Sequence, residues 1–250
     1  MELNNKLYDL FADKAEKTKV EISSLGLGYT AVTTSDGGMG IAYTYFDSKD
    51  SCSVVKGDHD YEDKPAVYLL ERIKSTNTIE RSQALALINA LNYEKALLLP
   101  EDKDNSVIFD KFDIGRGTRV AMVGFFGPLI KIFKERNAVL KIIDISRDIG
   151  HAEDFYGKLG DWAEVLFLTS TSLLNNTTEE ILENVGKNVK TVMLGPSTPM
   201  VSEAFEHLPV HMLAGTVPIE KEKVLKAVRH GMGTPVIHKF SRKSFRLLHD

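Results

Sequence analysis

The spacing of apolar residues changes several times along the first hundred positions, and each spacing predicts a different element. The chain opens with apolar side chains at helical intervals, at Leu3, Leu7, Leu10 and Phe11. Extended runs follow between residues 20 and 34, and the turn at 36–38 leads into a strand-like run at 40–46. Helical spacing then returns twice between residues 65 and 91. This order predicts a small α+β domain over residues 1–100.

The pattern changes after residue 100. Residues 99–113 are polar and charged around one short apolar run, which is typical of a linker. Short apolar runs then alternate with helical stretches, and they occupy Val120–Val123, Val139–Ile143, Val165–Leu168, Thr191–Leu194 and Val210–Leu213. Such runs are typical of buried parallel strands with helices on both faces of the sheet. We therefore predict an α/β fold, with a Rossmann-like parallel sheet domain over residues 101–250 behind the smaller α+β domain.

Glycines, hydroxyl side chains and one acid follow the predicted strands. The carboxyl ends of parallel strands share one edge of a sheet, and α/β proteins bind ligands at that edge where the strand order reverses. The candidate ligand-binding residues of this half are Gly124, Gly127, Asp144, Thr169, Ser170, Gly195, Ser197 and Thr198. Their N–H and O–H groups suit phosphate or carboxylate oxygens. The same residue types also suit helix caps and tight packing, so the pattern leaves both readings open.

The glycine turn after the first of these strands departs from the dinucleotide-binding pattern. After Gly124, the second and third glycine positions of that pattern hold Phe126 and Leu129. A bulky side chain at Phe126 hinders the close approach of a pyrophosphate to the backbone. The turn therefore argues against ordinary NAD binding and favours a smaller or differently posed ligand.

Composition narrows the class of partner. The 250 residues are 43% hydrophobic and 26% charged, and 31 basic against 35 acidic residues give a net charge of -4. We expect no nucleic-acid partner, because such binding needs a basic surface. The chain shows no signal-peptide order, no apolar run of membrane-spanning length and a single cysteine, Cys52. We therefore expect a cytoplasmic protein without a membrane partner, and a symmetric homodimer as the commonest assembly.

The sequence does not define a metal site or a catalytic residue. Asp58, His59 and Asp60 are adjacent, but a solvated polar loop explains them better than a metal site. His207 and His211 are four residues apart with Pro209 between them, so they do not share a helical face. The motifs of P-loop nucleotide hydrolases and serine hydrolases do not occur.

Five segments together carry a resemblance to a known family. They are SDGGMGIAYTYF in the first half and MVGFFGPLI, IIDISRD, LTSTSLLNNT and MLGPSTPM in the second. They resemble an uncharacterised two-domain family for which heavy-metal chelation has been proposed. The resemblance implies an enolase N-terminal-like domain followed by a Rossmann-like domain, with the site in the cleft between them. It also implies that Asp36, Gly37 and Gly38 face the loops of the second domain.

The functional expectation is a protein that binds a small anionic ligand in this cleft. A metal ion or metal chelate is the cofactor or cargo that the resemblance implies, and the sequence leaves its identity open. One alternative is a transferase or oxidoreductase with a nucleotide-type cofactor, whose first domain closes over the substrate as a lid. The other is a non-catalytic scaffold or partner protein.

Overall fold

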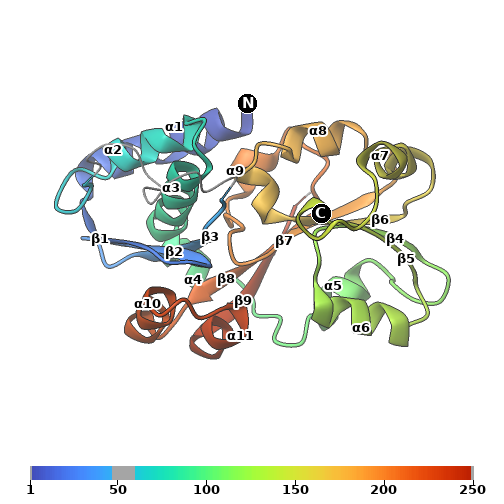
Figure 1. Cartoon of the computed structure of the whole chain (residues 1–250). Coiled ribbons are helices and arrows are strands. Elements are labelled where there is room, and N and C mark those ends of the chain that lie inside the picture. Colours follow the sequence, from blue (N-terminus) through green and yellow to red (C-terminus); the bar gives the residue numbers. More distant parts are fainter. Residues whose placement is uncertain (1, 47–59, 249–250) are drawn as a thin grey trace.

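The computed structural model describes residues 2–46 and 60–248, which form two adjoining units, each with its own sheet (Figure 1). Cys52, Asp58 and His59 lie outside the described residues. The first unit contains α1 (Glu2–Lys17), β1 (Val20–Leu25), β2 (Tyr29–Thr34), β3 (Met39–Tyr43), α2 (Val67–Leu70), η1 (Glu71–Lys74), α3 (Thr78–Leu91) and α4 (Tyr93–Leu97). Its strands pair antiparallel in the order β1-β2-β3.

Helix α3 is the central helix of the first unit. Asn77 caps its N-terminus by accepting hydrogen bonds from the N–H groups of Ile79 and Glu80. Strand β3 lies directly against this helix, because a Cβ added to Gly40 would come within 2.1 Å of the Ala86 carbonyl oxygen. Glycine is therefore required where the strand crosses the helix.

The second unit is built on a six-stranded sheet. Its elements are α5 (Ser106–Lys111), β4 (Arg119–Val123), α6 (Gly127–Glu135), β5 (Val139–Ile143), η2 (Ile145–Arg147), α7 (Ala152–Asp161), β6 (Val165–Thr169), η3 (Ser170–Leu173), α8 (Thr178–Glu183), β7 (Lys190–Leu194), α9 (Ser202–Phe205), β8 (Met212–Pro218) and β9 (Ser241–Leu247). The strand order is β5-β4-β6-β7-β8-β9, and only β9 runs antiparallel to its neighbour. The predicted α/β class is confirmed. The fifth predicted strand begins and ends later than expected, and β9 was not predicted.

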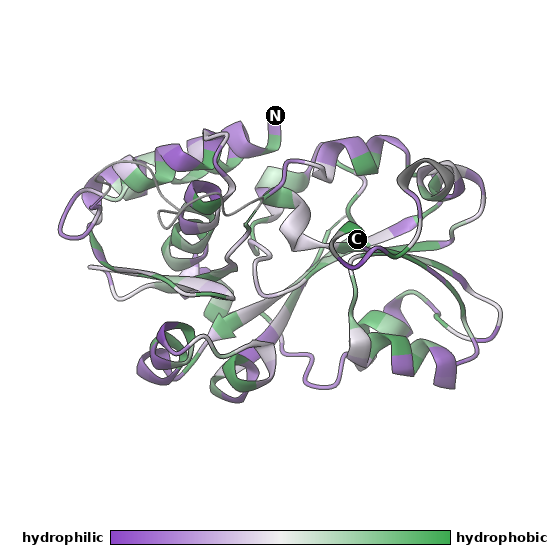
Figure 2. Cartoon of the chain, in the orientation of Figure 1, coloured by the Kyte–Doolittle hydropathy of each residue, from purple (hydrophilic) through white to green (hydrophobic). Residues whose placement is uncertain are grey.

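Helices cover both faces of the six-stranded sheet, with α5 and α6 on one face and α7, α8 and α9 on the other (Figure 1). Hydrophobic positions lie on the strands and on the helix sides that face them, while hydrophilic positions point outward (Figure 2). On the α5 and α6 face, Phe109, Phe133 and Phe167 form a buried aromatic cluster. No helix in the described part of the chain is both long enough and apolar enough to cross a bilayer.

Two helices from the second half of the sequence complete the first unit. After β8, the chain forms α10 (Lys221–Arg229), α11 (Thr234–Ile237) and η4 (His238–Phe240) before it returns as β9. These helices cover the open face of the three-stranded sheet (Figure 1). The cluster that they form consists of Tyr29, Ala31, Met39, Ile41, Val224, Ala227, Val228 and Ile237. The chain therefore crosses between the units near residue 100, after β8 and again before β9.

Candidate functional site

The strand order of the large sheet places the candidate site. The first strand along the chain, β4, lies between the second and the third, β5 and β6, and the later strands follow in chain order. The connection from β4 therefore leads toward one side of the sheet, to β5, whereas the connections from β6 and β7 lead toward the other side. In open α/β sheets, a crevice forms at the carboxyl ends of the strands at this point. Here that point lies between β4 and β6.

The loops after β4, β6 and β7 touch one another at this edge. Gly124 has a φ of +95°, and a Cβ added to it would lie 2.9 Å from Cβ of Thr169. Gly195 has a φ of +128°, and its added Cβ would lie 2.8 Å from Oγ of Ser170. These two glycines therefore allow neighbouring loops to pack closely, and tight packing was the alternative that the sequence left open for Gly124.

Several of the predicted hydroxyl groups are buried inside these loops. Ser170, Ser197 and Thr198 are 1%, 1% and 2% exposed. Oγ of Ser197 accepts a hydrogen bond from the backbone N–H of Tyr43 at 2.7 Å, and Oγ1 of Thr198 donates to the Gly195 carbonyl at 2.8 Å. The Ser197 contact joins the two units. These hydroxyls are therefore buried within the loops and stabilise them, and they do not form the surface of the edge.

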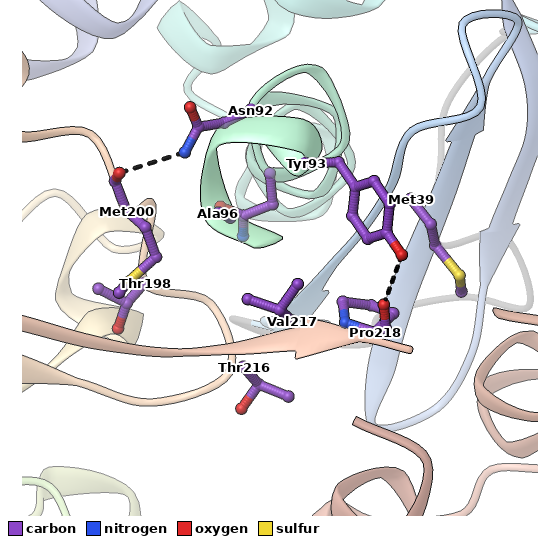
Figure 3. Close-up of a pocket in the computed structure, with 10 residues that line it drawn as sticks. Met39, Asn92, Tyr93, Ala96, Thr198, Met200, Thr216, Val217 and Pro218 are labelled. Atoms are coloured by element: carbon purple, nitrogen blue, oxygen red, sulfur yellow. Dashed lines mark hydrogen bonds between the residues drawn. The ribbon is translucent and has the colours of Figure 1, made fainter. Parts of the chain in front are cut away.

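Beside this edge the two units meet in a packed seam (Figure 3). A cavity of about 10 Å³ remains there, which is room for a single water molecule. Its lining comes from Met39, Asn89, Asn92, Tyr93, Ala96, Thr198, Met200, Thr216, Val217 and Pro218. Asn92 Nδ2 donates to the Met200 carbonyl at 3.2 Å, and the Tyr93 hydroxyl donates to the Pro218 carbonyl at 2.8 Å. This part of the junction is an interface and leaves no space for a ligand.

The turn at Asp36, Gly37 and Gly38 does not reach the carboxyl-edge loops. It lies at one end of β3, whereas Tyr43 meets Ser197 at the other end. Asp36 accepts from Oγ1 of Thr34 at 2.6 Å and pairs with Nζ of Lys14 at 2.8 Å. Burial alone would raise the pKa of Asp36, but the hydrogen bonds from Lys14 and Thr34 outweigh it, so its pKa is lowered. Its carboxylate organises the turn.

The accessible part of the edge lies where α6 begins. Phe126 precedes this helix and offers no side-chain cap, and the first turn of the helix carries no acidic residue. Gly127 is exposed at the helix start, with Cε1 of Phe125 3.7 Å from the position of an added Cβ. Pro128 has no N–H group and the Leu129 N–H donates to the Phe126 carbonyl at 2.9 Å, so the N–H of Gly127 is the donor that this helix start offers. The partial positive charge of the helix start favours an anion there.

The loop after β5 brings a cation to the same place. The guanidinium carbon of Arg147 lies 4.9 Å from the centre of the Phe125 ring, and Nε lies 3.6 Å from Oδ2 of Asp144. On the β6 side, Oγ1 of Thr169 and Oγ1 of Thr171 are 2.9 Å apart. Of the predicted residues, Gly127 begins α6, Asp144 pairs with Arg147, and Thr169 packs against Gly124 three residues before the helix. Arg147 and Phe125 were not predicted, although both belong to the segments that carry the family resemblance.

A row of tyrosines from the first unit continues this carboxyl edge. The rings of Tyr29 and Tyr43 meet edge to face at 6.0 Å, and those of Tyr43 and Tyr45 at 6.3 Å. Nδ2 of Asn175, in the segment after η3, donates to the Tyr45 hydroxyl at 3.4 Å. Burial raises the pKa of the Tyr29 phenol, so it stays neutral at physiological pH. The sequence signal for this row was the alternation of Tyr43 and Tyr45 at the end of a predicted strand.

Within residues 2–46 and 60–248, no group of three or more His, Cys, Asp or Glu side chains could hold a metal ion. His207 lies 3.9 Å from Glu2, and Nδ1 of His211 accepts from the Thr191 N–H at 3.1 Å. The two histidines therefore have different partners, as the proline between them suggested. Asp60 lies at the start of the second described segment, where its side chain accepts from the Glu62 N–H.

Comparison with known proteins identifies the class. Two family models, both described as "Putative heavy-metal chelation", match residues 8–92 and 107–247. The chain belongs to this family. An uncharacterised protein from Methanocaldococcus jannaschii is 23% identical over 261 residues, covering 97% of this chain and 95% of the relative.

Two solved structures of proteins with unknown function share the fold. The protein from Pyrococcus horikoshii has a TM-score of 0.82 and 21% identity, and the similarity covers 98% of this chain and 99% of that one. The protein from Desulfitobacterium hafniense DCB-2 has a TM-score of 0.75 and 17% identity, with 97% and 99% covered. These similarities concern the fold alone.

Proposed function

We propose that this protein binds a small anionic molecule, a metal chelate or its organic precursor, at the carboxyl edge of the six-stranded sheet. The observation that carries the proposal is the uncapped start of α6 beside the exposed guanidinium of Arg147. Both groups favour negative charge, and the hydrogen-bonded hydroxyl pair of Thr169 and Thr171 leaves one O–H as a further donor on the neighbouring loop. The family description supports a chelate as the form that the anion takes.

The hydrogen-bonding groups at this edge determine which part of a chelate the protein would recognise. Guanidinium, hydroxyl and backbone N–H groups donate hydrogen bonds, so they bind oxygen anions rather than a bare cation. We therefore propose that the organic ligand holds the metal and that the protein holds the carboxylates or phosphates of that ligand. Asp144 then positions Arg147 through their ion pair.

Isothermal titration calorimetry with nickel citrate, citrate alone and nickel chloride tests this proposal. Arg147→Gln should weaken binding of the citrate forms by about tenfold or more, because a charged hydrogen-bonding partner is lost. Gly127→Val should weaken it as well, by covering the helix start. Arg116→Gln is the matched control, because Arg116 is exposed near the amino end of β4.

The results separate the site from a general charge effect. Loss of affinity in Arg147→Gln with an unchanged Arg116→Gln variant would support the proposed site. Equal affinities in all variants, or no heat of binding with either citrate form, would rule it out. Nickel chloride that binds as tightly as nickel citrate would show that the metal, and not the anion, is recognised.

A further inference from the structure

Large apolar side chains are exposed on both sides of the candidate site. Phe125 is 41% exposed, Tyr43 is 40% exposed and Ile145, next to Asp144, is 77% exposed. Exposed apolar groups that gather around a polar spot mark binding surfaces more often than single exposed residues do. Phe125 and Tyr43 come from different units of the protein, so local sequence does not explain why both rings lie at this edge.

Contacts with neighbouring groups orient both rings. One face of Phe125 carries the Arg147 guanidinium, and its ring edge lies against Gly127. Tyr43 meets Tyr29 and Tyr45 at interplanar angles of 88° and 78°. The backbone N–H of Tyr43 is also fixed to Ser197. The rings are therefore held in place without a ligand, which lowers the entropy cost of binding one.

The sheet sets the spacing of the strand ends to which the two rings are attached. Phe125 follows β4, and Tyr43 is attached to the loop after β7, with β6 between these two strands. Neighbouring strands are about 4.8 Å apart, so the ends of β4 and β7 are separated by roughly 10 Å. The hydroxyls of Thr169 and Thr171, after β6, lie in the middle of this span. A span of this width accommodates one planar ring system whose acidic substituents reach the donors.

From these observations we infer that the ligand is a planar aromatic carboxylate, whose ring lies between Phe125 and Tyr43 while its anionic group meets Arg147 and the start of α6. This inference rests on the proposed function, because it names the chemical class of the ligand for the same site. Aromatic rings that carry two carboxylates also chelate metal ions when a ring nitrogen lies between the carboxylates.

A matched pair of ligands tests the aromatic ring separately from the charge. Isophthalate and cis-cyclohexane-1,3-dicarboxylate carry the same charge and the same spacing of carboxylates, but only isophthalate is flat and aromatic. Titration of the full chain should show isophthalate binding roughly 2- to 12-fold more tightly, the range expected for one aromatic pair. Phe125→Leu and Tyr43→Leu should each reduce this ratio toward one. Tyr68→Leu, at a tyrosine that is 53% exposed on α2, should leave it unchanged.

The outcomes separate the two proposals. If both dicarboxylates bind equally and Arg147→Gln weakens both, the anion site stands and the aromatic inference fails. If nickel citrate binds but neither dicarboxylate does, the aromatic inference also fails. If citrate and both dicarboxylates all fail to bind, the proposed function itself is wrong. A ratio that persists in both leucine variants would place the ring elsewhere and overturn the inference.

Discussion

At the scale of single residues, charged side chains in the first unit complete turns and helix ends. Lys14, on α1, donates to the Leu91 carbonyl at the end of α3 at 2.6 Å and also pairs with Asp36. The sequence predicted the turn at Asp36 from its own residue types. It did not predict the lysine, because Lys14 approaches only after α1 packs beside α3, and that packing depends on residues far apart in the chain.

Lys14→Met should lower the free energy of unfolding by about 1 kcal/mol at neutral pH, since both partners are partly exposed. The lowered pKa of Asp36 means that the ion pair stabilises the fold above the ordinary value of 3.8 and is lost as pH falls below it. Urea unfolding at pH 7 and pH 3 should therefore show a smaller difference between variant and wild type at pH 3. Lys17→Met, on the exposed side of α1, is the control. A difference that grows in acid would contradict this assignment.

At the scale of elements, the short apolar runs and turn residues were sufficient to predict the three strands of the small sheet and four of the parallel strands of the large one. Strand β9 was missed because its residues, SRKSFRL, include only two apolar side chains and no clear alternation. The site was predicted only in part, because a local sequence pattern does not show which side chains are buried. Local pattern placed glycines and hydroxyls after the strands, but it could not show that Ser170, Ser197 and Thr198 turn inward.

The crossing of β3 and α3 gives a prediction at this scale. Gly40→Ala should destabilise the protein by about 1–3 kcal/mol or more, because the new methyl group would meet backbone atoms of Ala86 and Ala90. Gly28→Ala is the matched control, since an added Cβ there meets nothing within 4 Å. Thermal unfolding of both variants measures the difference. Equal melting temperatures would mean that the strand and helix separate at little cost.

At the scale of the whole molecule, hydrogen bonds join the two units at several places. Ser197 is bonded to Tyr43, Tyr93 to the Pro218 carbonyl, and Nε of Arg81 donates to the Leu174 carbonyl at 2.6 Å. Closure of the first unit as a lid would have to break these bonds. The sequence also did not predict that α10 packs against the first unit. Its amphipathic pattern shows that the helix covers an apolar surface, but not which surface.

A substitution in α10 should therefore lower the stability of both units. Val228→Ala removes buried volume against the three-stranded sheet and should cost about 1–3 kcal/mol. Trp162, the single tryptophan, lies at the end of α7 in the second unit. We expect its fluorescence and the far-ultraviolet circular dichroism to report one shared, lowered midpoint in urea. Lys226→Ala, exposed on α10, is the control. A shift in circular dichroism without a shift in fluorescence would show that the units unfold independently.

The placement of α10 and α11 also limits where the chain can be cut to give a fragment that folds by itself. A fragment ending near residue 105 would contain all three strands of the small sheet but neither of the helices that cover Ala31, Met39 and Ile41. Those side chains would then face water, and such a fragment would aggregate or require a binding partner to remain in solution. Expression trials that aim to isolate the amino-terminal part should therefore supply residues 219–240 as well, either fused by a linker or as a separate peptide.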